Sequence, residues 1–142
     1  MTETTDKKAI EELFSGLGKA HAERDADAIV ACHAPDAVMF GLAPPLWQRG
    51  VKRDEIQAWL KTWDGPINIE GRNVELTVPG DAAFASALTR MRGSQKGKEV
   101  DFWFRMTQCL RKIDGRWLLV HNHASVPFHM DEDRRAALDL KP

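Results

Sequence analysis

The sequence predicts an α+β protein in which a curved antiparallel sheet wraps around N-terminal helices. Hydrophobic residues recur at helical spacing in the first part of the chain, as far as residue 63. After Pro66 the hydrophobic period changes from 3.6 to 2, the spacing of strands. Helices that precede a run of antiparallel strands cover one face of the resulting sheet. The 142 residues fit one domain, 1–142, with a core at about 6–128 and a charged tail at 129–142.

The first two helices are predicted from spacing and from capping residues. The first has an apolar stripe at i, i+3, i+4 and i+7, formed by Ile10, Leu13, Phe14 and Leu17. The second begins at Asp25, a residue type that caps helix N-termini well. It is expected to end before Pro35, because a residue that precedes proline avoids helical geometry.

A short strand, a loop and a third helix follow. Residues 37–40 are a brief apolar run and are predicted to form a strand. Residues 41–50 contain two prolines and two glycines, which favour a loop. A third helix is predicted over 52–63, where an Asp-Gly-Pro sequence stops it.

Four strands are predicted after the third helix. The first covers 67–78, and its apolar positions change parity at Gly71, which predicts a bulge there. The next three are expected at 82–92, 99–111 and 116–126, separated by glycine-containing turns.

Composition limits the partners. A net charge of −1 argues against a nucleic-acid-binding surface. No apolar run reaches the length of a signal peptide or a membrane span, so we expect a cytoplasmic protein without a membrane partner. The last three predicted strands carry apolar residues on both parities, with Trp103 and Trp117 opposed to Phe102 and Phe104. Because helices can cover only one sheet face, this pattern predicts a homodimer through the sheet.

The segment 120–128, VHNHASVPF, is the densest polar stretch of an otherwise apolar strand. Alternation places His121 and His123 on one face with Trp117 and Leu119, and Asn122 on the other face. A metal site needs at least three ligands, and no metal-binding spacing motif accompanies the two histidines. We therefore expect no metal and no cofactor, and the histidines remain either interface residues or catalytic residues.

Two segments, DAIVACHAPDAVMF and RKIDGRWLLVHNHASVPF, resemble the nuclear transport factor 2-like superfamily, in particular its SnoaL-like and ketosteroid-isomerase-like branches. The second segment is also similar to the association domain of calcium/calmodulin-dependent kinase II. The resemblance covers about 6–128 and implies a cone-shaped, cystatin-like α+β barrel with a pocket inside and dimers through the sheet. This fold hosts isomerases, dehydratases, cyclases and assembly domains, so the resemblance does not imply one activity.

The resemblance also allows a comparison with the ketosteroid isomerase site. The catalytic base of that enzyme falls on Gly41, its tyrosine near Leu17 and its second acid near Thr107. None of the three is retained and the chain contains no tyrosine, so steroid isomerisation by that mechanism is not expected. Asp36 matches an aspartate common in relatives. The candidate catalytic residues are Asp36, His121 and His123.

The resemblance implies that the strand face with Val120, Asn122 and Ala124 lines the pocket. The arginines with which the association domain holds a carboxylate fall on Ala87, Gln108 and Ala124, so that function is not implied. The predicted ligand-binding residues are mainly aromatic, with two neutral amides: Trp47, Trp59, Trp63, Phe102, Phe104, Met106, Gln108, Val120 and Asn122.

Two functions fit these observations. The first is binding of a small apolar organic molecule, with acid–base chemistry of the isomerase, dehydratase or cyclase type. The alternative is a non-catalytic dimerisation or assembly domain. A histidine that opens into a cavity favours the first function, and a histidine covered by a second subunit favours the alternative.

Overall fold

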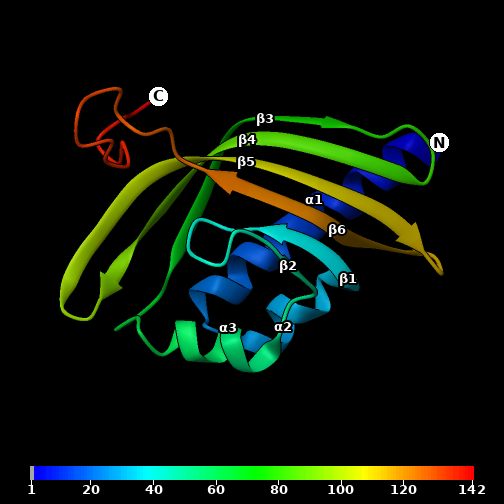
Figure 1. Ribbon diagram of the computed structural model, residues 1–142. Coiled ribbons are helices and arrows are strands. Elements are labelled where there is room, and N and C mark those ends of the chain that lie inside the picture. The colour runs from blue at the N-terminus through cyan, green and yellow to red at the C-terminus, as the bar shows by residue number, and fades with distance from the viewer. Residues whose placement is uncertain (1) are drawn as a thin grey trace.

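The fold places three helices against the concave face of a curved sheet, which confirms the predicted α+β class (Figure 1). The computed structural model describes residues 2–142. Its elements are α1 (Thr2–Ala22), α2 (Ala26–Ala31), β1 (His33–Phe40), β2 (Gln48–Arg49), α3 (Arg53–Leu60), β3 (Asn68–Thr77), β4 (Ala82–Gln95), β5 (Lys98–Ile113) and β6 (Arg116–Ser125). No helix among these residues is long and apolar enough to cross a membrane.

The six strands form one open sheet in the order β2-β1-β6-β5-β4-β3. It differs from the prediction in two details. Strands β1 and β6 run parallel, whereas the other neighbours are antiparallel. The sheet also ends at β2 and β3, so it does not close into a barrel. Hydrophobic period indicates the face that a residue occupies, but it does not indicate which strand lies beside it or in which direction.

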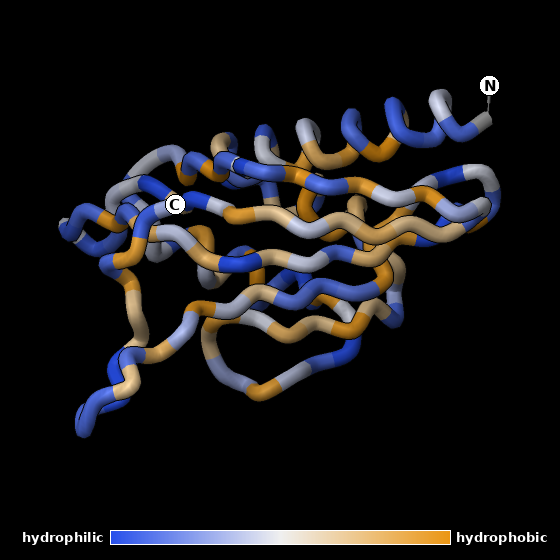
Figure 2. The backbone as a smooth tube through the Cα atoms, turned by 90° about the horizontal axis from the view of Figure 1, so that it is seen from above, coloured by the Kyte–Doolittle hydropathy of each residue, from blue (hydrophilic) through white to orange (hydrophobic). Residues whose placement is uncertain are grey.

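Two hydrophobic clusters hold α1 against the sheet and the other helices. Ile10 belongs to the first cluster, with Trp117 and Leu119 of β6. Ala20 belongs to the second, with residues of α2, Trp63 and Ile67. Leu17 packs against both clusters. Figure 2 shows α1 running alongside the sheet, with hydrophobic and hydrophilic residues alternating along it.

Strand β6 contains a bulge that changes which of its residues face inward. Cys109 pairs with His121, but the next residue, Leu110, pairs with Leu119. Val120 is therefore an extra residue without a partner on β5. Trp117 and Leu119 were predicted on the face of the two histidines, and this prediction was wrong: both are buried in the core, on the same face as Asn122. A single inserted residue reverses the alternation on one side of it.

Other element boundaries also moved. Helix α2 ends at Ala31, and β1 begins at His33, so Pro35 lies within a strand. The pairing of β1 with β6 is irregular between His33 and Val38, and this irregularity accommodates a proline that has no N–H to donate. In β3 the bulge lies between Arg72 and Glu75, not at Gly71.

Candidate active site

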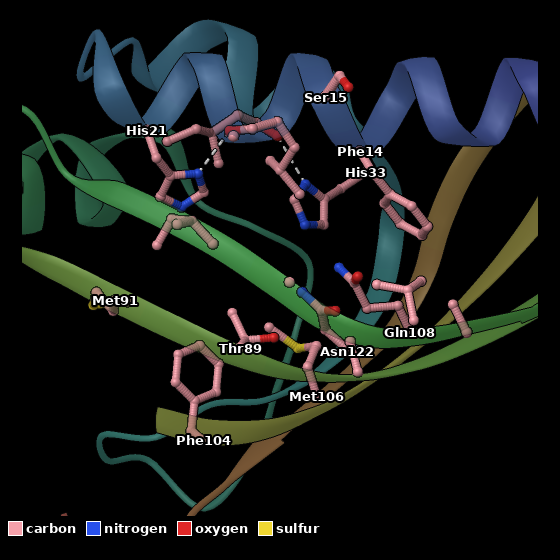
Figure 3. Close-up of a pocket in the computed structure, with 18 of the residues that line it drawn as sticks. Phe14, Ser15, His21, His33, Thr89, Met91, Phe104, Met106, Gln108 and Asn122 are labelled. Carbon is pink, nitrogen blue, oxygen red and sulfur yellow. Dashed lines mark hydrogen bonds between the residues drawn. The ribbon is translucent and has the colours of Figure 1, made fainter. Parts of the chain in front are cut away.

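A cavity of about 420 Å³ lies between the helices and the concave face of the sheet (Figure 3). Most of its wall is apolar and includes Phe14, Ile29, Ile56, Met91 and Phe104. Among the described residues, no Asp, Glu, Lys or Arg lines it. A cavity of this size and lining suits a small, mostly apolar organic molecule.

His21 reaches the cavity from the last turn of α1. Its Nδ1 lies 2.8 Å from the carbonyl oxygen of Leu17. A carbonyl oxygen can only accept a hydrogen bond, so Nδ1 carries the proton and Nε2 keeps a lone pair. Figure 3 shows this second nitrogen pointing into the cavity. Trp59 of α3 packs edge-on against the His21 ring, with centroids 6.1 Å apart, and helps to hold its orientation.

His33 approaches the same space from the first position of β1. Its Nδ1 lies 2.8 Å from the carbonyl oxygen of Ile29 in α2. The same reasoning fixes the same tautomer, and the Nε2 of His33 also points into the cavity (Figure 3). Two imidazoles from different elements therefore present lone pairs to one cavity.

Burial keeps both imidazoles uncharged. It lowers the pKa of His21 and outweighs the hydrogen bond to Leu17, which alone would raise that pKa. Burial likewise lowers the pKa of His33, the bond to Ile29 opposes this, and the neighbouring His21 lowers the pKa further. Both rings are therefore neutral near pH 7.

The opposite wall of the cavity is the sheet. Gln108 of β5 and Asn122 of β6 are cross-strand partners, and both line the cavity together with the buried Thr89 of β4. In Figure 3 the two amides project from the strands on the side opposite the histidines. The Oδ1 atom of Asn122 is buried and has no hydrogen-bond partner among the described residues. An unsatisfied buried acceptor costs about 1–3 kcal/mol.

Several of the predicted ligand-binding residues lie in the cavity wall, namely Phe104, Met106, Gln108 and Asn122. Val120 does not line the cavity, because it is the unpaired residue of the bulge. Phe102 also lies outside the lining, with its ring 5.7 Å from that of Phe104.

None of the three predicted tryptophans lines the cavity. Trp63 is buried in the second cluster, and Trp59 packs between Trp63 and His21. Trp47 is 51% exposed on the loop before β2, where its ring faces Arg49. The sequence indicated aromatic residues near a pocket, but helix packing placed Trp59 and Trp63 behind the wall.

The three predicted catalytic residues also lie outside the cavity. Asp36 is exposed on β1. The strand was predicted to start after Asp36, but it starts at His33. His121 and His123 lie on the convex face, where the Phe40 ring packs edge-on against both at centroid distances of 5.1 and 5.2 Å. This agrees with the expected parity of Asn122 against the two histidines.

The sequence did contain a signal for His21. It continues the stripe of Ile10, Phe14 and Leu17, at position i+4 from Leu17, so a histidine occupies an otherwise apolar helix face. His33 gave a weaker signal: it follows the buried Ile29 by four residues, but it lies two residues before Pro35, where the second helix was expected to have ended.

The positions matched to ketosteroid isomerase do not converge in the structure. Gly41 is exposed on the loop after β1, and Thr107 is exposed on β5 between the cavity-lining Met106 and Gln108. Only Leu17 lines the cavity. Among the described residues, no group of three or more His, Cys, Asp and Glu could hold a metal ion.

Comparison with known proteins supports the predicted resemblance. The model of the SnoaL-like domain matches residues 10–129. No curated protein matches the chain.

Solved structures share the fold. A nuclear transport factor 2-like protein of unknown function from Pseudomonas putida has 29% identity and a TM-score of 0.87, covering 98% of each chain. A proposed scytalone dehydratase from Novosphingobium aromaticivorans has 17% identity and a TM-score of 0.72, covering 87% of each chain. A proposed calcium/calmodulin-dependent protein kinase II association domain from Xanthomonas campestris has 21% identity and a TM-score of 0.69, covering 82% of this chain and 84% of that chain. With most of its length matched by the family model, the chain belongs to the SnoaL-like family.

Proposed function

We propose that this protein binds a small, mostly apolar organic molecule and performs acid–base chemistry on it, with His21 and His33 as proton acceptors. The observation that carries the proposal is the pair of neutral imidazoles whose Nε2 atoms face an uncharged, apolar cavity. A base that is desolvated and held in one tautomer is suited to proton abstraction. This proposal replaces Asp36, His121 and His123 as the proton carriers.

The chemistry is a proton transfer at carbon. An Nε2 atom takes a proton from an acidic C–H group. In an isomerisation, the imidazolium returns this proton to another atom of the same molecule. In a dehydration, it gives the proton to the departing hydroxyl group as the C–O bond breaks, and water leaves. Gln108 and Asn122, on the opposite wall, hydrogen-bond the oxygen atoms of the substrate. Isomerisation and dehydration both follow this scheme, and the likeness in fold to a proposed dehydratase supports the second reaction type.

A generic carbon acid tests the proposal without knowledge of the natural substrate. In 5-nitrobenzisoxazole, a base removes the C–H proton, the ring N–O bond breaks, and a coloured cyanophenolate forms. We expect the wild-type protein to accelerate this reaction. We expect the His21→Gln/His33→Gln double variant to lose at least about tenfold in rate, since a positioned base contributes on the order of 10²–10⁴-fold.

His121→Gln and His123→Gln are the matched controls, because both histidines lie on the other face of the sheet. They should retain the wild-type rate. A double variant of His21 and His33 as active as the wild type would contradict the proposal. Loss of rate in the His121 or His123 variants alone would return those residues to the active site.

A second candidate function, assembly through the convex sheet face, has its own support. Phe84 is 51% exposed, and Phe40 packs with His121 and His123 on the same face. We propose that a second copy of the chain covers this face. Light scattering at micromolar concentration should give the mass of a dimer, and Phe84→Lys should shift it towards a monomer. A wild-type monomer would exclude the dimer and the assembly function, but not catalysis.

A further inference from the structure

The hydrogen-bonding atoms of the cavity differ between its two walls. On the helix side, His21 and His33 each use their only N–H on a backbone carbonyl, at 2.8 Å in both cases. Their remaining nitrogens can only accept. On the sheet side, the Oδ1 of Asn122 is another acceptor without a partner among residues 2–142. The helix wall therefore offers acceptors and no donor from its imidazoles.

We infer that the cavity selects a neutral compound that carries a hydroxyl group and donates it to one of the two imidazoles, His21 or His33, which leaves the other imidazole free to act as the base. The inference deepens the proposed function and rests on it. A hydroxyl group satisfies an imidazole lone pair, whereas an ether, a ketone or a carboxylate brings only further acceptors to the same nitrogen.

The uncharged lining of the cavity disfavours the binding of anions. No arginine or lysine is among the described lining residues, so a carboxylate would enter an apolar space without a counter-charge. Burial of an unpaired charge is far more costly than burial of a hydroxyl group. The lone pairs of the two imidazoles would also repel it.

The sheet wall does not impose the same selection. The amides of Gln108 and Asn122 contain both donors and acceptors, and Thr89 has a hydroxyl group that can act as either. These groups can accept a second hydroxyl or bind a carbonyl oxygen on the far side of the ligand. The preference for a donor therefore comes from the two histidines.

Three naphthalene probes of similar size test the inference. The first, 2-naphthol, donates a hydrogen bond; 2-methoxynaphthalene only accepts; 2-naphthoate is an anion. We expect calorimetric titration at pH 7.5 to show 2-naphthol binding about five- to tenfold more tightly than 2-methoxynaphthalene, the effect of one net hydrogen bond of about 1 kcal/mol. The anion should bind most weakly.

The His21→Leu/His33→Leu variant should bind 2-naphthol and 2-methoxynaphthalene equally, because it keeps apolar bulk and removes both acceptors. His123→Leu, on the other sheet face, should keep the wild-type preference. If the double variant does not fold, the affinities of the wild-type protein for 2-naphthol and 2-methoxynaphthalene still test the selection for a hydrogen-bond donor.

The outcomes separate the two proposals. Equal binding of 2-naphthol and 2-methoxynaphthalene, or tightest binding of 2-naphthoate, overturns the selection for donors and leaves the proposed function in place. Failure of all three probes to bind overturns the proposed function and this inference with it.

Discussion

The indole N–H of Trp117 donates a hydrogen bond to the carboxylate of Asp6, 3.1 Å away in space and 111 residues away in sequence. The Lys112 ammonium lies 3.2 Å from the same oxygen. The hydrogen bond from Trp117 is the main cause that lowers the pKa of Asp6, and the contacts with Lys112 lower it further. Burial of the carboxylate opposes both effects. The contacts with Trp117 and Lys112 fasten the first turns of α1 to strands β5 and β6, and so place the helix that carries His21.

Asp6→Asn should lower the melting temperature. The amide keeps an acceptor for Trp117 but removes the charge that faces Lys112. Glu11→Gln, at an exposed position of the same helix, is the control and should change the melting temperature little. Differential scanning calorimetry distinguishes the two, and an unchanged Asp6 variant would show that this anchor does not contribute to stability.

Stability should fall as the pH is lowered from about 6.5. The pKa values of His21 and His33 lie below the ordinary 6.5, so the unfolded chain binds protons in this range more readily than the folded chain. The free energy of unfolding, measured in urea, should be lower at pH 5.5 than at pH 7.5. Between pH 7.5 and 8.5 these two histidines should leave the free energy of unfolding nearly unchanged.

The His21→Gln/His33→Gln variant provides the comparison for this pH dependence. It lacks both groups, so its free energy of unfolding should fall less between pH 7.5 and 5.5. If the variant keeps the full dependence of the wild type, groups other than these two histidines cause it.

Gly93→Ala should destabilise the fold. A Cβ atom at this position would lie 2.9 Å from the Trp63 ring and 3.0 Å from the Pro66 carbonyl oxygen. Overpacking of this kind costs about 1–3 kcal/mol. Gly16→Ala is a matched control, because nothing lies within 4 Å of that position in α1. It should stabilise the protein by about 0.5–1 kcal/mol; chemical denaturation of both variants would show opposite signs.

Asn122→Leu should weaken binding of 2-naphthol without lowering the melting temperature. The substitution removes an amide from the cavity wall and, with it, a buried oxygen that has no partner among the described residues. His123→Leu, one residue along on the other face, should affect binding less and self-association more. Undiminished binding by the Asn122 variant would exclude a contact with the ligand.

Steroid isomerase activity should be absent. Gly41 supplies no carboxylate, the sequence contains no tyrosine, and Thr107 is not among the residues that line the cavity. A spectrophotometric assay with a 5-ene-3-ketosteroid should give the rate of buffer alone. Turnover that survives in the His21→Gln/His33→Gln variant would reveal a different set of catalytic groups.

The sequence by itself determined the class of fold and the identity of most elements. The stripe that begins at Ile10 predicted α1, and the change of period after Pro66 predicted the long strands. These features are local, because side-chain periodicity follows from the geometry of a single helix or strand. The inward direction of Gln108 and Asn122 was accessible for the same reason, together with the resemblance to the family.

Only the tertiary structure decided which histidines face the cavity. His21 and His33 are 12 positions apart on different elements, and they meet because α1 and β1 pack around one space. His121 and His123 looked more prominent as a pair, yet their strand turns them to the convex face. The parallel pairing of β1 with β6 and the bulge at Val120 depend on contacts between distant segments. Periodicity along one strand carries no information about such contacts, because it reports which side chains share a face and not what the opposing element brings to it.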